Sequence, residues 1–181
     1  EVVLISEALH EQKISDIATK IITDPRKPRI VLIAGPSSSG KTTFSKRLSI
    51  QLLAQGVEPF AIELDNYFVD REKTPKDENG DYDFESIGAV KVDLLSHHLQ
   101  GLINGEEIQL PKYDFKEGKA VTGDTIRLHK DQVLILEGIH GLNPALLPGI
   151  PSKNLFRLYA SCLTQLNLDR YNRISTTDTR L

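Results

Sequence analysis

The chain has 181 residues, of which 39% are hydrophobic and 26% are charged, and its formal net charge is −3 at pH 7. This length suits one domain with a substantial core, and this composition excludes disordered, collagen-like and disulfide-dense proteins. The slight negative charge excludes a generally basic nucleic-acid-binding protein, because neutralising phosphates requires clustered Lys and Arg.

The cysteine content and the length of the apolar runs bear on the cellular location of the protein. The single cysteine, Cys162, excludes an internal disulfide and a four-thiolate metal site, so we expect a reducing, cytoplasmic location. The apolar runs are far shorter than the ~20 residues that cross a bilayer, and we expect no membrane partner. The chain contains no methionine, so we expect it to be part of a longer protein.

The first predicted element is a helix over residues 7–23, where apolar residues recur at near-helical spacing before Pro25 ends the pattern. We assign residues 1–28 to an N-terminal helix and linker that continue an upstream region. Residues 29–181 then form the main domain.

A strand, a turn, a helix and a second strand follow. Residues 29–34 are a short, continuous, β-branched run, typical of a strand buried on both faces of a parallel sheet. A glycine-bounded turn over 35–40 leads into an amphipathic helix that ends near Gly56, and residues 59–64 predict the second strand. This unit favours an open parallel α/β sheet.

The middle of the chain is more polar. Residues 70–86 show no apolar period and predict a long loop, and residues 92–102 predict a helix. Two short β-prone segments, 107–110 and 125–128, flank the polar stretch 113–123 and predict a small hairpin-like excursion from the main sheet. Residues 133–136 and 155–160 predict two more strands, and the residues after 163 predict a helix.

The strongest motif is the phosphate-binding loop over 35–42, which reads Gly-Pro-Ser-Ser-Ser-Gly-Lys-Thr and fits G-x-x-x-x-G-K-[ST]. Its glycines let the backbone curl so that N–H groups point at phosphate oxygens, and the following helix adds its N-terminal dipole. Lys41 can reach the β- and γ-phosphates, and the Thr42 hydroxyl can bind Mg²⁺. The predicted phosphate-binding residues are Gly35, Pro36, Ser37, Ser38, Ser39, Gly40, Lys41, Thr42 and Thr43. The fold class is therefore α/β, an open parallel sheet of the P-loop NTPase type flanked by helices, with a small hairpin-like insertion.

Two acids end predicted strands beside this loop. Asp65 follows the second strand and Glu137 ends the third, so both are expected at the carboxyl edge of the sheet. Two such acids can hold Mg²⁺ directly or through water, and one can accept the proton of an attacking hydroxyl. The alternatives are helix capping for Asp65 and an ion pair with Lys41 for Glu137.

Four motifs together resemble the uridine kinase and phosphoribulokinase family of P-loop kinases. They are the phosphate loop, Leu-Asp-Asn-Tyr-Phe at 64–68, Leu-Pro-Lys-Tyr-Asp-Phe at 110–115 and Leu-Glu-Gly-Ile at 136–139. They follow the family's order and roughly its spacing, and the resemblance extends from about residue 30 to residue 181.

The resemblance implies an ATP-dependent kinase that uses Mg²⁺. It implies that Asp65 is the catalytic base and that Thr42 and Glu137 are the Mg²⁺ partners. Its place at the strand edge makes Asp65 a third metal candidate, and its place in the phosphate loop makes Lys41 a candidate catalytic residue. Asp83 is similar to the family aspartate that holds ribose hydroxyls, and Tyr113 and Phe115 are similar to aromatics that line the nucleoside pocket.

The residues themselves support this acceptor site less sharply. Tyr113 and Phe115 alternate in an extended segment and can offer flat surfaces to a base, although core packing is an equal alternative. Asp83 has the alternative of a solvated loop acid. Residues 63–86 hold nine acidic and three basic residues, a charge that would repel a phosphorylated acceptor and suits a neutral polyol.

The chain also departs from the family. Uridine kinases usually carry a histidine shortly after the Tyr-Asp-Phe motif, where this chain reads Lys-Glu-Gly at 116–118. Residues 164–177 resemble a bacterial branch of nucleoside kinases. The last four residues match the beginning of the family's lid helix, and the arginine-rich lid that should follow is missing, which leaves Arg173 and Arg180 as candidate cations.

We therefore predict a kinase that transfers the γ-phosphate of ATP to a hydroxyl of a uridine-like or cytidine-like nucleoside. The alternatives are a kinase for another small alcohol, such as pantothenate, and a nucleotide-binding regulatory module without transferase activity. A GTPase is disfavoured because the chain lacks an Asn-Lys-x-Asp guanine motif. We expect a nucleotide and a small alcohol as partners, no nucleic acid, and a homo-oligomer as one option.

Overall fold

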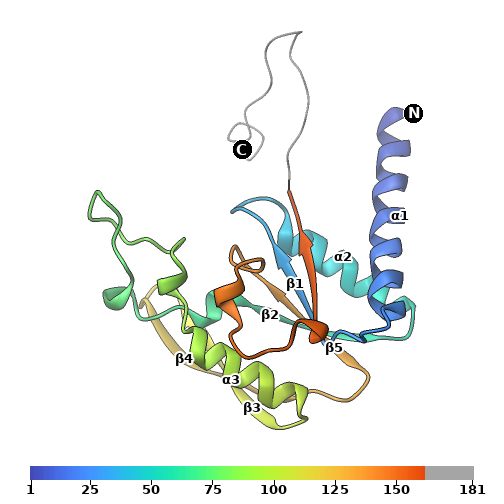
Figure 1. The fold of residues 1–181 in the computed structure, drawn as a ribbon. Coiled ribbons are helices and arrows are strands. Elements are labelled where there is room, and N and C mark those ends of the chain that lie inside the picture. The colour runs from blue at the N-terminus through green and yellow to red at the C-terminus, as the bar shows by residue number, and fades with distance from the viewer. Residues whose placement is uncertain (162–181) are drawn as a thin grey trace.

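The computed structural model describes residues 1–161 and contains a parallel sheet with a separate hairpin (Figure 1). The sheet has four parallel strands in the order β2-β5-β1-β6. Their bounds are Ile30–Ala34 for β1, Glu58–Glu63 for β2, Gln132–Glu137 for β5 and Leu155–Tyr159 for β6. The predicted open parallel α/β sheet is therefore confirmed.

Helices cover both faces of the sheet (Figure 1). They are α1 at Val2–Thr23, α2 at Lys41–Ala54 and α3 at Val92–Ile103. Alternate residues of β1 serve the two faces: Val31 and Ile33 pack with α1 and α2, whereas Ile30 and Leu32 pack with α3 and the hairpin. All five residues of β1 are buried, which explains why its sequence is apolar throughout instead of alternating.

Helix α1 is longer than predicted, because it begins at Val2 and not at residue 7. Its second half packs on α2 through Ile14, Ala18 and Ile21, which are buried. Its first turns are exposed, with Val2 at 77%, so no core contact fixes where the helix starts. The prediction relies on apolar periodicity, which reflects burial, so it gives no indication of helix in these exposed first turns.

The hairpin is also longer than predicted. Its strands, β3 at Glu107–Asp114 and β4 at Lys119–Arg127, are antiparallel and run through most of the stretch that was expected to be a polar excursion. One face of the hairpin packs against the core through Ile108, Leu110 and Ile126. The other face meets solvent, so polar residues alternate with apolar ones and hide the strand pattern.

The segment between β2 and α3 is mainly loop, as predicted, with short 3₁₀ helices in it. These are η1 at Leu64–Tyr67, η2 at Arg71–Lys73 and η3 at Ile87–Ala89; two more, η4 at Pro144–Leu146 and η5 at Ser152–Asn154, lie between β5 and β6. No helix among the described residues is long and apolar enough to span a membrane. The expectations for Cys162, for 164–177, for Arg173 and for Arg180 fall outside the described residues.

Candidate active site

The phosphate loop leaves β1 and opens α2, the context that its sequence motif requires. Gly40 precedes the helix with φ of 84°, a left-handed conformation that glycine adopts without strain. Gly35 lies against the backbone, since a Cβ there would stand 2.2 Å from the Ala160 carbonyl oxygen. The Lys41 ammonium donates to the Pro36 carbonyl at 2.8 Å. These constraints hold the loop curled over the N-terminus of α2, which suits an anion.

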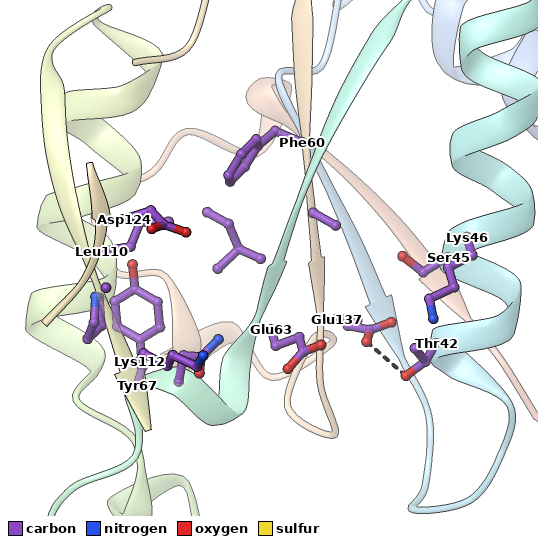
Figure 2. A pocket seen from close by; sticks show the side chains of 15 residues that line it. Thr42, Ser45, Lys46, Phe60, Glu63, Tyr67, Leu110, Lys112, Asp124 and Glu137 are labelled. Atoms are coloured by element: carbon purple, nitrogen blue, oxygen red, sulfur yellow. Dashed lines mark hydrogen bonds between the residues drawn. The ribbon is translucent and has the colours of Figure 1, made fainter. Parts of the chain in front are cut away.

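Thr42 and Glu137 meet across the carboxyl edge of the sheet (Figure 2). The Thr42 hydroxyl donates to Glu137 Oε1 at 2.9 Å. Glu137 is only 9% exposed, and its Oε2 is buried with no hydrogen-bond partner among the described residues. Burial raises the pKa of this carboxyl, which the Thr42 hydrogen bond partly offsets. Lys41 also lowers the pKa of this carboxyl, and the second carboxylate oxygen can still accept a ligand.

This arrangement fits a magnesium ion that arrives with a nucleotide. Among the described residues, no group of three or more His, Cys, Asp and Glu side chains is placed to hold a metal alone. Mg²⁺ is commonly held by one or two protein oxygens together with substrate phosphates and water. The Thr42 hydroxyl and the Glu137 carboxylate, beside the phosphate loop, offer that partial set of ligands.

Asp65 lies in the same place. It follows β2 in η1 and lines a cavity of about 290 Å³, the phosphate cavity, with the loop and both metal candidates. Its remaining lining residues are Ser37, Ser38, Lys41, Thr42, Glu63, Glu137, Gly138 and Ile139. Burial and the neighbouring Glu63 raise the pKa of Asp65, and the Lys41 charge lowers it. The two strand-end acids, Asp65 and Glu137, therefore face one cavity.

Glu63 is a third acid of this cavity that the sequence analysis did not select. It is the last residue of β2 and stands in register with Glu137 of β5, so the two side chains emerge together (Figure 2). The sequence signal that could have identified Glu63 was its position near the end of a predicted strand, where Asp65 and Glu137 were selected. Glu63, Glu137 and Thr42 also border a neighbouring cavity of about 350 Å³. Its lining side chains come mainly from β2, α2 and the hairpin (Figure 2).

A third cavity, of about 340 Å³, adjoins the phosphate cavity and shares Ser37, Asp65 and Ile139 with it. Aromatic rings form much of its wall, so we name it the aromatic cavity. Its other lining residues are Phe68, Arg71, Phe84, Glu85, Tyr113 and Phe115. The Tyr113 and Phe115 rings are 5.1 Å apart between centroids, and the Phe68 and Tyr113 rings 5.8 Å. Tyr113 near the end of β3 and Phe115 just after it thus face the same cavity.

The structure places Asp83 differently from its neighbours. Its carboxylate accepts a hydrogen bond from the Glu85 backbone N–H at 2.9 Å, which caps the local turn, and Asp83 does not line the aromatic cavity. Phe84 and Glu85 do. The residues that sequence reasoning missed here are Phe68, Arg71, Phe84 and Glu85, and only the ring-forming ones carried a signal, their aromatic character.

Comparisons with known proteins agree with this geometry. Residues 30–147 match the sequence model of the Phosphoribulokinase / Uridine kinase family. A uridine kinase of Halobacterium salinarum is 32% identical over 111 residues, which cover 61% of this chain and 48% of that protein. A uridine kinase of Brevibacillus brevis is 37% identical over 112 residues, which cover 62% and 51%. The chain thus spans about half the length of the curated relatives that it matches.

Solved structures show the same fold. One, described as a possible uridine kinase from Bacillus stearothermophilus, superposes with a TM-score of 0.64 at 25% identity and covers 82% of this chain and 79% of its own. A D-glycerate 3-kinase from Cryptococcus neoformans superposes with a TM-score of 0.54 at 20% identity and covers 72% and 52%. The second likeness supports the fold alone.

Proposed function

This chain belongs to the phosphoribulokinase / uridine kinase family, and we propose that it carries out ATP-dependent transfer of the γ-phosphate to a hydroxyl of a nucleoside. The observation that carries the proposal is the junction of the two cavities at Ser37, Asp65 and Ile139. A triphosphate in the phosphate cavity and an alcohol in the aromatic cavity would meet at the Asp65 carboxylate.

Each part of the site has one task in this proposal. The loop amides and Lys41 would orient the triphosphate, and Thr42 with Glu137 would hold the Mg²⁺ ion. When bound, Mg²⁺ offsets negative charge on the phosphates. Asp65 accepts the proton of the acceptor hydroxyl as that oxygen forms its bond to the γ-phosphorus and the bond to the leaving ADP oxygen breaks.

The cavity walls support a nucleoside as the acceptor. Flat aromatic side chains offer stacking surfaces to a base, and the acids Asp65 and Glu85 repel an acceptor that already carries a phosphate. Asp83 caps a turn beside this cavity, and we propose Glu85 together with Asp83 as the acids nearest the ribose hydroxyls. A pantothenate-like acceptor has no ring to stack and is not favoured.

We also propose a cytoplasmic location and a homo-oligomeric state. The exposed apolar residues in the first turns of α1, from Val2 to Ile5, support self-association, because exposed apolar patches often mark protein contacts. Light scattering of the full-length protein measures its mass in solution, and a monomer at all concentrations would contradict the oligomer.

A transfer assay tests the function. Full-length protein is incubated with γ-labelled ATP, Mg²⁺ and a panel of nucleosides and other small alcohols. We expect label on the 5′-hydroxyl of a pyrimidine nucleoside, and Lys41→Ala should weaken both ATP binding and turnover. Label on another alcohol supports a different kinase, and tight ATP binding with no labelled acceptor supports a regulatory module.

A further inference from the structure

Arg71 joins the long loop to the hairpin. Its backbone N–H donates to the Gly118 carbonyl at 2.8 Å, and its guanidinium Nη2 donates to the Phe115 carbonyl. Both acceptors belong to the turn over residues 115–118, which we call the hairpin tip. One residue of η2 therefore fixes the tip through its main chain and its side chain.

The packing at the tip is close. Gly118 has a φ of +67°, and a Cβ there would stand 2.8 Å from Arg71 Cβ and 2.9 Å from Arg71 Nε. The side chain of Arg71 thus lies directly against the glycine. A larger residue at 118 would push the guanidinium away, so Gly118 provides the space that Arg71 occupies.

Arg71 also faces the aromatic cavity. It is partly buried and lines the wall with Phe115 and Tyr113. Its charge acts on Tyr113, where it opposes the rise in pKa that burial causes. The Tyr113 hydroxyl is buried without a hydrogen-bond partner among the described residues. Of the described residues that line this cavity, Arg71 alone is a cation, and the charged residues facing it are the acids Asp65 and Glu85.

A guanidinium has five N–H donors and no acceptor, and the Phe115 carbonyl engages one of its nitrogens. The acceptor hydroxyl must reach Asp65, at the junction with the phosphate cavity. The far edge of an attached base would then extend toward the hairpin tip, where it would meet the Arg71 guanidinium. A carbonyl oxygen at that edge would accept from such donors, whereas a bare ring carbon would leave them unpaired.

We propose that Arg71 is an acceptor-binding residue that selects bases with a carbonyl oxygen on the edge distal to the sugar, the 4-oxo group of a uracil-type base. This assignment rests on the proposed nucleoside kinase function. It adds a residue from the loop after β2 to the recognition of the base.

The test compares uridine with pyrimidin-2-one riboside, which lacks the 4-oxygen, in full-length protein. Arg71→Gln removes the cation, Arg71→Lys keeps the charge without the planar fork, and Lys73→Gln is the matched control, since Lys73 lies in the same 3₁₀ helix and is 75% exposed. We expect the wild type to prefer uridine in kcat/KM by about tenfold or more, the range of a hydrogen bond from a charged donor. Arg71→Gln should abolish that preference by raising the KM for uridine, Arg71→Lys should reduce it, and Lys73→Gln should leave it intact.

The outcomes separate the two levels of the argument. If the wild type phosphorylates no nucleoside, the proposed function fails and the role of Arg71 fails with it. If the wild type is active but shows no preference for uridine, or if both Arg71 variants keep the preference, only the assignment of Arg71 is overturned. An equal loss for both ribosides would indicate that Arg71 merely holds the hairpin tip, and this too overturns the assignment. The KM for ATP, expected within about twofold of wild type in every variant, and the melting temperature report whether a variant has lost its fold.

Discussion

Replacing Asp65 with asparagine tests the chemical step directly. Asparagine has the same shape, and its carbonyl oxygen can still accept a hydrogen bond from the acceptor hydroxyl, but it cannot take the proton. Positioned general bases contribute roughly a hundredfold to ten-thousandfold to a rate, or about 3 to 5 kcal/mol of the barrier. We expect kcat of Asp65→Asn to fall within that range.

The surroundings of Asp65 predict two further results that a misfolded variant would not give. Because burial and Glu63 raise the pKa of Asp65, the ionised carboxylate is less favourable in the folded protein than in the unfolded chain. At low pH the carboxyl is protonated in both states and costs the fold nothing. As pH rises through the raised pKa, the carboxyl must ionise in a buried place, and the free energy of unfolding falls. At pH 7 the neutral asparagine should therefore raise the melting temperature. The KM for ATP should stay the same or fall, since one negative charge beside the triphosphate is gone.

The assay measures kcat, both KM values and the melting temperature of full-length protein. Asp81→Asn is the matched control, because Asp81 is an exposed acid of the long loop outside the phosphate cavity. Turnover of Asp65→Asn within threefold of wild type would refute the role of Asp65. A fall in melting temperature with a loss of ATP binding would show that the carboxylate acts on the fold.

Three other changes test the site and its support. Thr42→Val removes the hydroxyl that holds the buried acid, and the Mg²⁺ concentration for half-maximal activity should rise about tenfold or more; an unchanged metal titration would contradict the metal site. Gly35→Ala puts a methyl group 2.2 Å from the Ala160 carbonyl oxygen and should lower the free energy of unfolding, measured in urea, by about 1–3 kcal/mol. The control Gly80→Ala should cost less, because φ there is +88° but no atom lies within 4 Å of the added methyl group. Burial lowers the pKa of His98, so as pH falls below 6.5 the imidazole is protonated more readily in the unfolded chain, and the free energy of unfolding drops between pH 7 and 5. His98→Asn should make this dependence of stability on pH less steep. An equally steep dependence would exclude His98 as its cause.

The sequence predicted the parts of the site that repeat a local pattern. The phosphate loop combines glycines at fixed spacing with a strand before it and a helix after it, and all of these lie within a few residues. Asp65 and Glu137 are far apart in the chain, yet each follows a recognisable strand. Because parallel strands end at one edge of a sheet, two local predictions were enough to bring the two acids into one cavity.

The parts that sequence reasoning missed depend on contacts between segments. Arg71 belongs to a polar stretch without periodicity, and its importance comes from two carbonyls of the hairpin tip, more than 40 residues away. Asp83 and Glu85 are both acids of one loop, and the choice between them follows from a turn in which Asp83 accepts the Glu85 N–H. Nothing in the sequence distinguishes these two acids as candidates for the cavity wall. The path of the backbone decides which side chain lines the aromatic cavity.

The candidate site is built on two parts of the fold, the main sheet and the hairpin. The phosphate loop and the metal candidates rest on β1, β5 and α2, which are tied into the main sheet. The aromatic cavity uses the hairpin, which, within residues 1–161, forms a separate two-stranded sheet and shares no strand pairing with the main one. Two-stranded sheets are only marginally stable alone, so contacts such as those of Arg71 must hold the hairpin in place. Under the proposed function, a change in the hairpin should therefore alter which acceptor binds while the phosphate-binding part of the site stays the same.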